Sequence, residues 1–245
     1  MPRFFSSSQN ISTKKITIKD KKQVHHLKDV LRLQPKDEIT IFDEKGNEYR
    51  CIIDKLSNKA TLDIKKKKLF SDSKSNGIQI AVACAIPKNS KMDDIIDKLT
   101  QLGVSRIIPL ETKHVIVKLD TKKKEMKFMR WQKVIISASQ QSQRKTLPIL
   151  EPVRNIREAL SNAQGFDLKL IPTLLGKRKS LKEIIGKANY KNILILIGPE
   201  GDFTPEEIAV AVKAGCLPIT LGKTVLRVET AAVAIVGFIK LYADD

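Results

Sequence analysis

The segment that most restricts the fold is an aliphatic strand that runs directly into a glycine turn and then into a helix. Ile193–Ile197 are all aliphatic, and Gly198-Pro199-Glu200-Gly201 follows at once. Thr204, Pro205 and Glu207 then suit the N-cap, the first helical position and the third residue of a capping box. A strand, a tight turn and a capped helix in this order favour a parallel sheet, whose ligand crevice lies at the carboxyl ends of its strands.

Strands and helices continue to alternate through residues 77–245. Ile78–Ala85 and Ile107–Leu110 are apolar strand candidates, and the segment between them is an amphipathic helix that ends at Gly103. Later strands are expected at residues 168–171 and around 218–220. We therefore predict an α/β domain with a mainly parallel sheet over residues 77–245.

Residues 1–72 have a different pattern. Asp20 and Gln23 form a capping-box pattern at the start of an amphipathic helix. The apolar face of this helix would consist of Val24, Leu27, Val30 and Leu31. Three β-rich stretches follow, at residues 38–42, 49–53 and 60–64. We predict a small β-barrel-like domain with one helix, joined to the second domain by a polar linker of small residues near 72–77.

Basic residues far outnumber acidic ones. Lys and Arg total 45 against 27 for Asp and Glu, which gives a formal net charge of +18 and predicts a polyanionic partner. Apolar residues make up 42%, which argues against intrinsic disorder. The longest apolar stretches fall short of the roughly 18–20 residues that a transmembrane helix needs, and the N-terminus lacks the apolar run of a secretory signal. We expect a cytoplasmic protein with no membrane partner.

The cysteines and histidines argue against several kinds of chemistry. Cys51, Cys84 and Cys216 are widely spaced and form no C-x-x-C pair, so we expect buried thiols rather than disulfides or a thiolate metal site. The whole chain contains 3 histidines, so we expect neither a histidine-rich metal centre nor a Ser-His-Asp triad. No metal site is predicted.

A second glycine turn makes the pattern specific. The Gly198–Gly201 turn alone lacks both the G-x-G-x-x-G spacing of a dinucleotide fold and the Gly-Lys-Ser/Thr ending of a P-loop. Leu221-Gly222 and Leu226–Ala231 follow the strand near residue 219. With the opening Pro2-Arg3-Phe4 and with Lys91-Met92, these segments resemble the RsmE family of the SPOUT superfamily. The resemblance extends over nearly the whole chain.

This resemblance implies a homodimeric enzyme that uses S-adenosylmethionine to methylate uracil N3 in small-subunit (16S) ribosomal RNA. It also implies a PUA-like RNA-binding barrel over residues 1–72 and a deep trefoil knot in the α/β domain, which general topology rules do not predict. In this superfamily the knotted loops form the cofactor pocket. By match, the candidate cofactor-binding residues are Pro172, Thr173, Ile197, Gly198, Pro199, Glu200, Gly201, Leu221, Gly222, Val225, Leu226, Thr230 and Ala231.

The implied reaction suggests three candidate catalytic residues. Uracil N3 becomes a nucleophile only when its proton leaves, and negative charge then spreads onto O2 and O4. We expect Arg227 to stabilise that anion, and Glu200 or Glu229 to accept the proton or orient a water. Structural alternatives are a salt bridge for Arg227 and, for Glu229, a place at the positive end of the last helix. The identity of the general base stays open.

Three positions depart from the family pattern. The family usually has a second glycine where this chain has Asp202, and a Glu and a Gly where it has Gln140 and Gln143. Aspartate tolerates left-handed backbone better than most residues, so we expect the turn at Asp202 to be preserved. The loss of a carboxylate at Gln140 matters if that group assists catalysis, and a structural role is the alternative.

Methylation at N3 requires access to a base that is single-stranded or flipped out of its stack. Exposed cations would hold the RNA, and for the lysine run at 65–68 the alternative is a solvated strand edge that resists aggregation. The candidate RNA contacts are Arg3, His26, Arg32, Lys65, Lys66, Lys67, Lys68, Lys118 and Arg144.

The last helix, Thr230–Tyr242, is apolar almost all round. We expect it to be buried, partly against a second subunit, with burial in the monomer core alone as the alternative.

Two alternative functions remain open. They are a SPOUT ribose 2'-O-methyltransferase and a non-catalytic RNA-binding factor for ribosome assembly. The N-terminal barrel disfavours the first, and the two glycine turns disfavour the second.

Overall fold

The computed structural model describes residues 1–70, 77–87, 91–114, 119–186 and 190–243. The chain forms two compact units, one of Met1–Ser75 with Ser139–Leu147 and the other of Asn76–Ala138 with Pro148–Asp245. The linker predicted near residues 72–77 lies outside the described residues except for residue 77, and so does the expected RNA contact Lys118. No helix in the described ranges is long and apolar enough to cross a membrane.

The first unit contains a five-stranded sheet in the order β1-β3-β4-β5-β2. Strand β1 pairs with β3 in parallel, and the other pairs are antiparallel. No pairing within the described residues joins β1 to β2, so the sheet is a half-barrel rather than a closed barrel. The elements are β1 (Arg3–Phe5), η1 (Ser8–Asn10), β2 (Lys15–Ile18), α1 (Lys21–His25), η2 (His26–Val30), β3 (Glu38–Phe42), β4 (Glu48–Leu56) and β5 (Ala60–Lys68).

The helix of this unit begins as predicted but changes its winding. The Asp20 carboxylate accepts a hydrogen bond from Gln23 N at 2.9 Å, and α1 then continues into the π-helical segment η2. Val24 and Leu27 are buried in the core of the half-barrel, whereas Val30 and Leu31 are 56% and 39% exposed. The predicted apolar face is therefore wrong in its second half, because the wider π turn rotates later residues away from α-helical positions.

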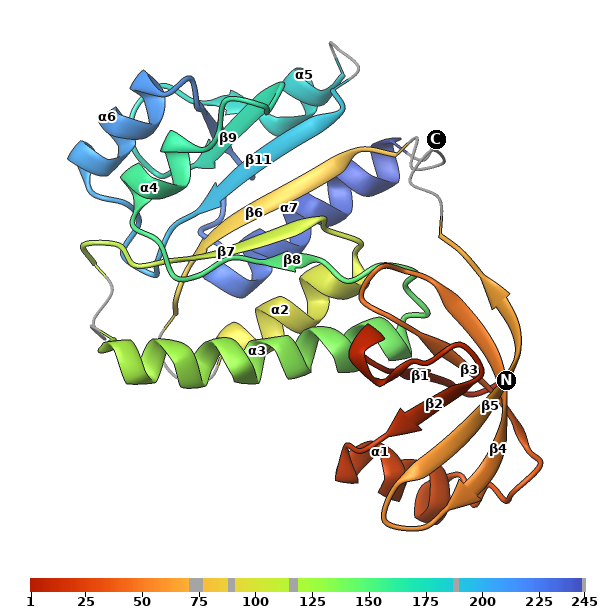
Figure 1. The fold of residues 1–245 in the computed structure, drawn as a ribbon. Helices are drawn as coiled ribbons and strands as arrows, with labels where there is room; N and C mark the ends of the chain where they lie inside the picture. The colour runs from red at the N-terminus through yellow and green to blue at the C-terminus, as the bar shows by residue number, and fades with distance from the viewer. Residues whose placement is uncertain (71–76, 88–90, 115–118, 187–189, 244–245) are drawn as a thin grey trace. The chain divides into compact units, whose positions relative to one another are not determined.

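The second unit contains a seven-stranded sheet in the order β10-β12-β9-β11-β6-β7-β8, in which every neighbouring pair is parallel. The predicted parallel α/β architecture is confirmed (Figure 1). The elements are β6 (Gln79–Ala85), α2 (Lys91–Gln101), β7 (Arg106–Leu110), α3 (Thr121–Gln141), β8 (Ile149–Leu150), α4 (Ile156–Ser161), β9 (Leu168–Pro172), β10 (Lys179–Ser180), α5 (Leu181–Ile185), β11 (Asn192–Ile197), α6 (Pro205–Lys213), β12 (Leu217–Thr220) and α7 (Val228–Ala243).

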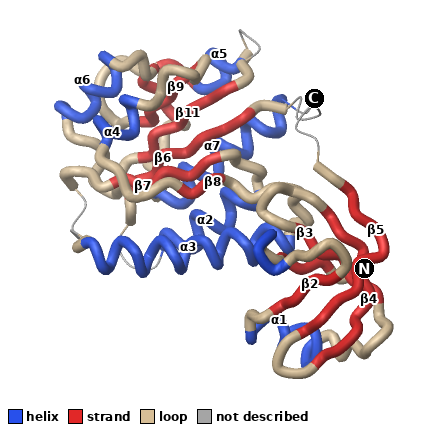
Figure 2. Tube along the Cα trace, in the orientation of Figure 1, coloured by secondary structure: helices blue, strands red, loops and turns tan. Residues whose placement is uncertain are grey.

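Helices cover both faces of this sheet (Figures 1 and 2). On one face, α4 and α6 pack over Ala83, Leu194 and Leu196. On the other, α7 contacts β6, β11 and α2. This coverage explains why the central strands β6 and β11 are apolar on successive residues, since side chains on both faces are buried.

Candidate functional site

A cleft of about 580 Å³ lies in the second unit at the carboxyl ends of three neighbouring strands, β9, β11 and β12. Its walls are residues 172–174 at the end of β9, residues 197–200 and 202 at the end of β11, and residues 219–226 at the end of β12. Val228 and Ala231 of α7 and Arg178 complete the lining. Because these strands are parallel neighbours, their carboxyl ends meet, and this is where open α/β sheets bind ligands. The volume suits a ligand of drug or cofactor size.

Most of the residues expected to bind a cofactor line this cleft. The exceptions are Gly201, whose position faces His114, and Thr230, which is exposed on the first turn of α7. Sequence reasoning missed several lining residues that sit in the same loops, namely Leu174, Asp202, Lys223 and Thr224. It also missed Arg178, for which the sequence carries no motif. The expected residues that line the cleft are Pro172, Thr173, Ile197, Gly198, Pro199, Glu200, Leu221, Gly222, Val225, Leu226 and Ala231.

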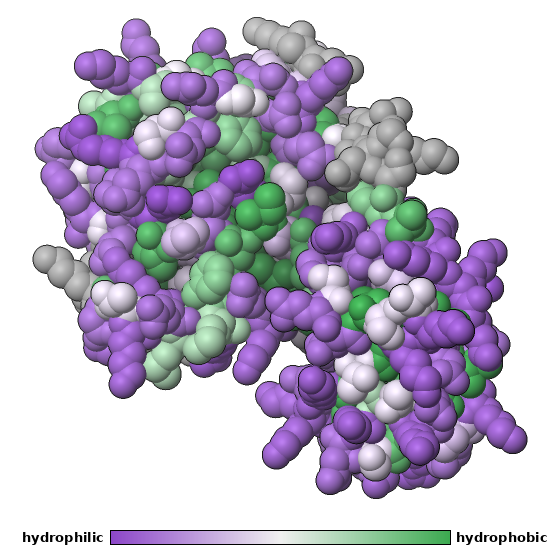
Figure 3. Space-filling view, viewed as in Figure 1, coloured by the Kyte–Doolittle hydropathy of each residue, from purple (hydrophilic) through white to green (hydrophobic). Residues whose placement is uncertain are grey.

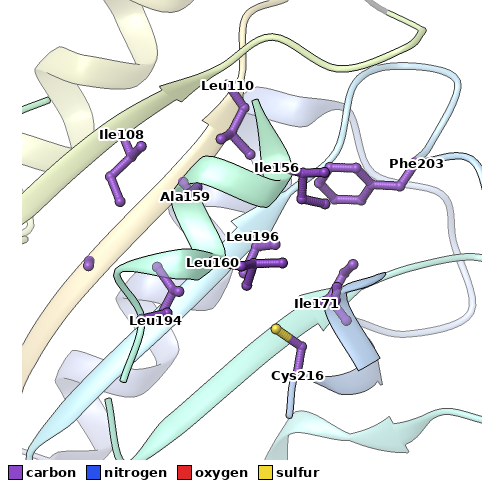
Figure 4. Close-up of a cluster of buried hydrophobic side chains, with 14 residues drawn as sticks. Ile108, Leu110, Ile156, Ala159, Leu160, Ile171, Leu194, Leu196, Phe203 and Cys216 are labelled. Carbon is purple, nitrogen blue, oxygen red and sulfur yellow. The ribbon is translucent and has the colours of Figure 1, made fainter. Parts of the chain in front are cut away.

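The loop after β11 is held by a buried phenylalanine and by a capped helix. Thr204 Oγ1 accepts a hydrogen bond from Glu207 N at 3.2 Å, and the Glu207 carboxylate accepts one from Thr204 N at 2.9 Å. This confirms the predicted capping box of α6. Ahead of it, Phe203 is 1% exposed and packs against the α4 face of the sheet, beside Ile156 (Figure 4). The loop is thus anchored by apolar burial on one side and by hydrogen bonds on the other.

The loop after β12 makes a tight local turn. Thr220 Oγ1 donates to Gly222 O at 3.0 Å and accepts from Gly222 N at 3.3 Å. Gly222 has φ +129°, a conformation that residues with a Cβ rarely adopt. Val225, three residues on, is 72% exposed at the mouth of the cleft. The whole segment from Leu221 to Leu226 lines the cleft.

The three candidate catalytic residues differ in their surroundings. Glu200 is exposed and lines the cleft. Arg227 is exposed between two lining residues, Leu226 and Val228, but its own side chain does not line the cleft in this structure. Glu229 lies in the first turn of α7, and its Oε1 is 3.0 Å from Lys91 Nζ. The structure brings all three to the same end of the sheet.

The electrostatic surroundings separate the two acids. A hydrogen bond from its own backbone N–H, and then the Lys91 ammonium, lower the pKa of Glu229. A carboxylate with a lowered pKa is a weaker base, and its contact with Lys91 occupies one of its oxygens. Glu229 is thus paired with Lys91 between α2 and α7, whereas Glu200 lines the cleft.

Two of the expected RNA contacts make internal contacts in the first unit. The Arg3 guanidinium stacks 3.8 Å above the Phe42 ring, pairs with Glu48, and donates to Arg144 O at 2.7 Å. Its side chain is 10% exposed, and burial lowers the pKa of this group. Burial also lowers the pKa of Arg144 to about 10. These contacts attach the segment 139–147 to the half-barrel.

The remaining described cations in this set are on the surface. Lys65, Lys66, Lys67 and Lys68 form an exposed row at the end of β5, and the Lys67 ammonium lies 5.6 Å from the centre of the Tyr49 ring. Arg32 is exposed, as is His26, whose ring makes an edge contact with Phe4. The face drawn in Figure 3 is mainly hydrophilic over both units. These residues are therefore available to a polyanion.

Two protein families match two different parts of the chain. Residues 74–240 match the RNA methyltransferase domain family, and residues 18–67 match the RNA methyltransferase PUA domain family. The chain is 30% identical over 242 residues to the ribosomal RNA small subunit methyltransferase E of Rickettsia conorii, a match that covers 98% of this chain and 95% of that protein. It is 33% identical to the protein of the same name from Mesomycoplasma hyopneumoniae, with 86% and 87% covered.

A solved structure extends the likeness to three dimensions. It is the ribosomal RNA small subunit methyltransferase E from Neisseria gonorrhoeae, bound to S-adenosyl methionine. The two chains share 31% sequence identity and superpose with a TM-score of 0.82, with 99% of this chain and 98% of that chain covered. The similarity therefore includes both units.

Proposed function

The chain belongs to the RNA methyltransferase family that includes ribosomal RNA small subunit methyltransferase E, and from this we propose that it methylates uracil N3 of a uridine in small-subunit ribosomal RNA. The methyl donor is S-adenosylmethionine, which the Neisseria gonorrhoeae relative binds. The observation that supports this most strongly is the cleft, because both glycine-containing loops line it at the carboxyl ends of β11 and β12.

The residues of the cleft fit this cofactor. Aliphatic side chains at Ile197, Ile219 and Leu226 supply apolar surface for a flat adenine. Gly198 lies where a Cβ would be within 3.1 Å of the Phe203 ring, so the loop is already closely packed on its far side. The Glu200 carboxylate matches the positive charge of a sulfonium group.

The protein's own residues then prepare the nucleophile. When bound, S-adenosylmethionine supplies an electrophilic methyl group on sulfur. Glu200 accepts the proton from uracil N3 directly or through a water, since it lines the cleft, whereas the Asp202 carboxylate there already accepts three hydrogen bonds. Arg227 turns toward the base and stabilises the negative charge that develops on O2 and O4. Glu229 holds Lys91 and the start of α7 in place.

Exposed cations of the first unit bind the RNA backbone. We assign this to the exposed row Lys65–Lys68 together with Arg32 and His26. We leave out Arg3, whose side chain is engaged within the unit, and Arg144, whose guanidinium is partly buried. Contacts of this kind neutralise phosphates and carry no base specificity. RNA affinity should therefore fall steeply with salt, with a log–log slope of about −0.7 per phosphate contacted on single-stranded RNA.

Family membership also supports a trefoil knot in the second unit and a homodimer. For the dimer, the structure offers an apolar strip on the outer side of α7, where Phe238, Leu241 and Tyr242 are 36%, 74% and 48% exposed. Phe238 and Tyr242 are stacked with ring centres 6.0 Å apart. A second copy of the chain would bury this strip.

Nucleoside mass spectrometry tests the proposed reaction. Small-subunit RNA from a strain that lacks the gene is incubated with purified protein and S-adenosylmethionine, digested, and compared with untreated RNA. We expect 3-methyluridine to appear. A ribose-methylated nucleoside would favour the ribose methyltransferase instead. No methylation, with no calorimetric binding of S-adenosylmethionine, would favour a non-catalytic RNA-binding factor.

A further inference from the structure

The Asp202 carboxylate connects two walls of the cleft. Its Oδ2 accepts hydrogen bonds from Thr173 Oγ1 at 2.9 Å and from Leu174 N at 2.8 Å, both in the segment after β9. Its Oδ1 accepts from Phe203 N at 2.8 Å within its own loop after β11. One side chain thus joins loops that are 28 residues apart or more in sequence.

The backbone of Asp202 brings in a third loop. Its carbonyl oxygen accepts a hydrogen bond from His114 Nδ1 at 2.9 Å, and a carbonyl only accepts, so Nδ1 of His114 carries the hydrogen. His114 lies in the segment after β7. Asp202 N in turn donates to Pro199 O at 3.0 Å, which closes the turn. Through its side chain and its backbone, Asp202 therefore connects the segments that follow β7, β9 and β11.

Asp202 makes these contacts from an unfavourable backbone conformation. Its φ is +61°, in the left-handed region that glycine adopts most easily. A residue held there costs conformational free energy relative to glycine, and such outliers persist where the surrounding structure over-determines them. Here the three hydrogen bonds to the carboxylate offset that cost.

We propose that Asp202 is a positioning residue that sets the spacing between the Thr173–Leu174 wall and the Gly198–Phe203 wall before the cofactor binds. The carboxylate acts as a bridge between loops, so the loops do not have to be ordered by the ligand. This inference depends on the proposed function only for the identity of the ligand. It makes Asp202 a determinant of cofactor affinity that acts through the loops rather than by direct chemistry.

Three variants separate this role from a general effect on folding. Asp202→Gly removes the bridge and suits the positive φ, so the fold should be retained. Asp202→Asn keeps one acceptor oxygen and also tolerates this φ. The matched control is Asp167→Asn, because Asp167 accepts from Lys191 N and Asn192 N, both at 2.8 Å, at the opposite ends of β9 and β11.

The readouts are calorimetric affinity for S-adenosylmethionine and S-adenosylhomocysteine, steady-state kinetics, and amide exchange in the unliganded protein. For Asp202→Gly we expect both affinities to fall about tenfold, ~1.4 kcal/mol, and the Leu174 amide to exchange faster. KM for the donor should rise by a similar factor while kcat at saturation stays close to wild type. Asp202→Asn should lie between Asp202→Gly and wild type, and Asp167→Asn should match wild type in both affinities.

Each alternative result contradicts the proposal in a different way. Wild-type affinity in Asp202→Gly would show that the bridge does not set the spacing. A loss confined to S-adenosylmethionine would assign the carboxylate to the sulfonium charge, because the sulfur of S-adenosylhomocysteine is a neutral thioether. Unchanged exchange at Leu174 would show that the loop is held by other contacts. The exchange readout needs no ligand, so it still tests the bridge if the wild-type protein fails to bind the donor, an outcome that would refute the proposed function instead.

Discussion

Replacing Gly198 by alanine tests whether close packing behind the cleft determines its shape. Gly198 is the first residue after β11, and a Cβ built there lies 3.1 and 3.2 Å from ring atoms of Phe203 and 3.3 Å from Asp202 Oδ1. Its backbone is outside the left-handed region, so alanine is excluded by crowding and not by φ. Phe203 is 1% exposed and lies beside Ile156 in the buried apolar cluster (Figure 4).

The expected size of the effect follows from these distances. Contacts this short require the Phe203 ring or the loop to shift by a few tenths of an ångström, and overpacking of this kind costs about 1–3 kcal/mol. Alanine also reduces the conformational entropy of the unfolded chain, which offsets about 0.4–1 kcal/mol of that cost. Each kcal/mol of net destabilisation lowers Tm by roughly 2–4 °C in a chain of this size. Because Gly198 lines the cleft, affinity for S-adenosylmethionine should fall in parallel.

Gly201→Ala is the matched control. A Cβ at that position meets the ring and Cβ of His114 at 3.7–4.0 Å, which is ordinary van der Waals contact. Its effect on stability should stay within about 0.5 kcal/mol. Thermal unfolding and calorimetric titration of both variants measure the difference. Equal behaviour of the two variants, or a Gly198→Ala variant with wild-type Tm and affinity, would refute the steric reasoning.

Three further predictions concern other parts of the molecule. Arg227→Ala should bind S-adenosylmethionine normally but lose about 10²–10³-fold in methyl transfer, and unchanged turnover in single-turnover assays would remove Arg227 from the mechanism. Gln143→Gly should raise the free energy of unfolding by about 0.5–1 kcal/mol in urea titrations, because Gln143 has φ +55° where glycine is unstrained; a loss of stability would contradict this. Leu241→Asp should shift the protein toward monomer in sedimentation experiments by placing a charge in the apolar strip of α7, and an unchanged mass distribution would place the dimer interface elsewhere.

At two positions where the family usually has glycine, this chain has another residue in the same left-handed backbone conformation. Asp202 and Gln143 both adopt positive φ, at +61° and +55°. The turns are therefore preserved although the residue that suits them best is missing. The reason differs at the two sites: the Asp202 carboxylate gains three hydrogen bonds, whereas exposed Gln143 gains no comparable set among the described contacts.

Sequence reasoning located the elements whose residue patterns are local. The capping box of α6 and the turn at Gly222 are made by residues within four positions of one another. The strands at 38–42 and 193–197 pair with distant segments, but their runs of β-forming residues could be read directly. It failed at η2, because nothing in the spacing of Val24, Leu27 and Val30 signals a change from α to π winding.

The sequence by itself determined that a strand, a glycine turn and a helix occur twice near the end of the chain, and that the chain carries a large excess of positive charge. Only the tertiary structure decided which loops share a cleft, because that depends on the strand order β12-β9-β11. It also decided that Arg3 is used inside its own unit, through a contact with a carbonyl 141 residues away. Such pairings join distant parts of the chain, and local residue patterns carry no information about which distant segments the packing of the core will bring together.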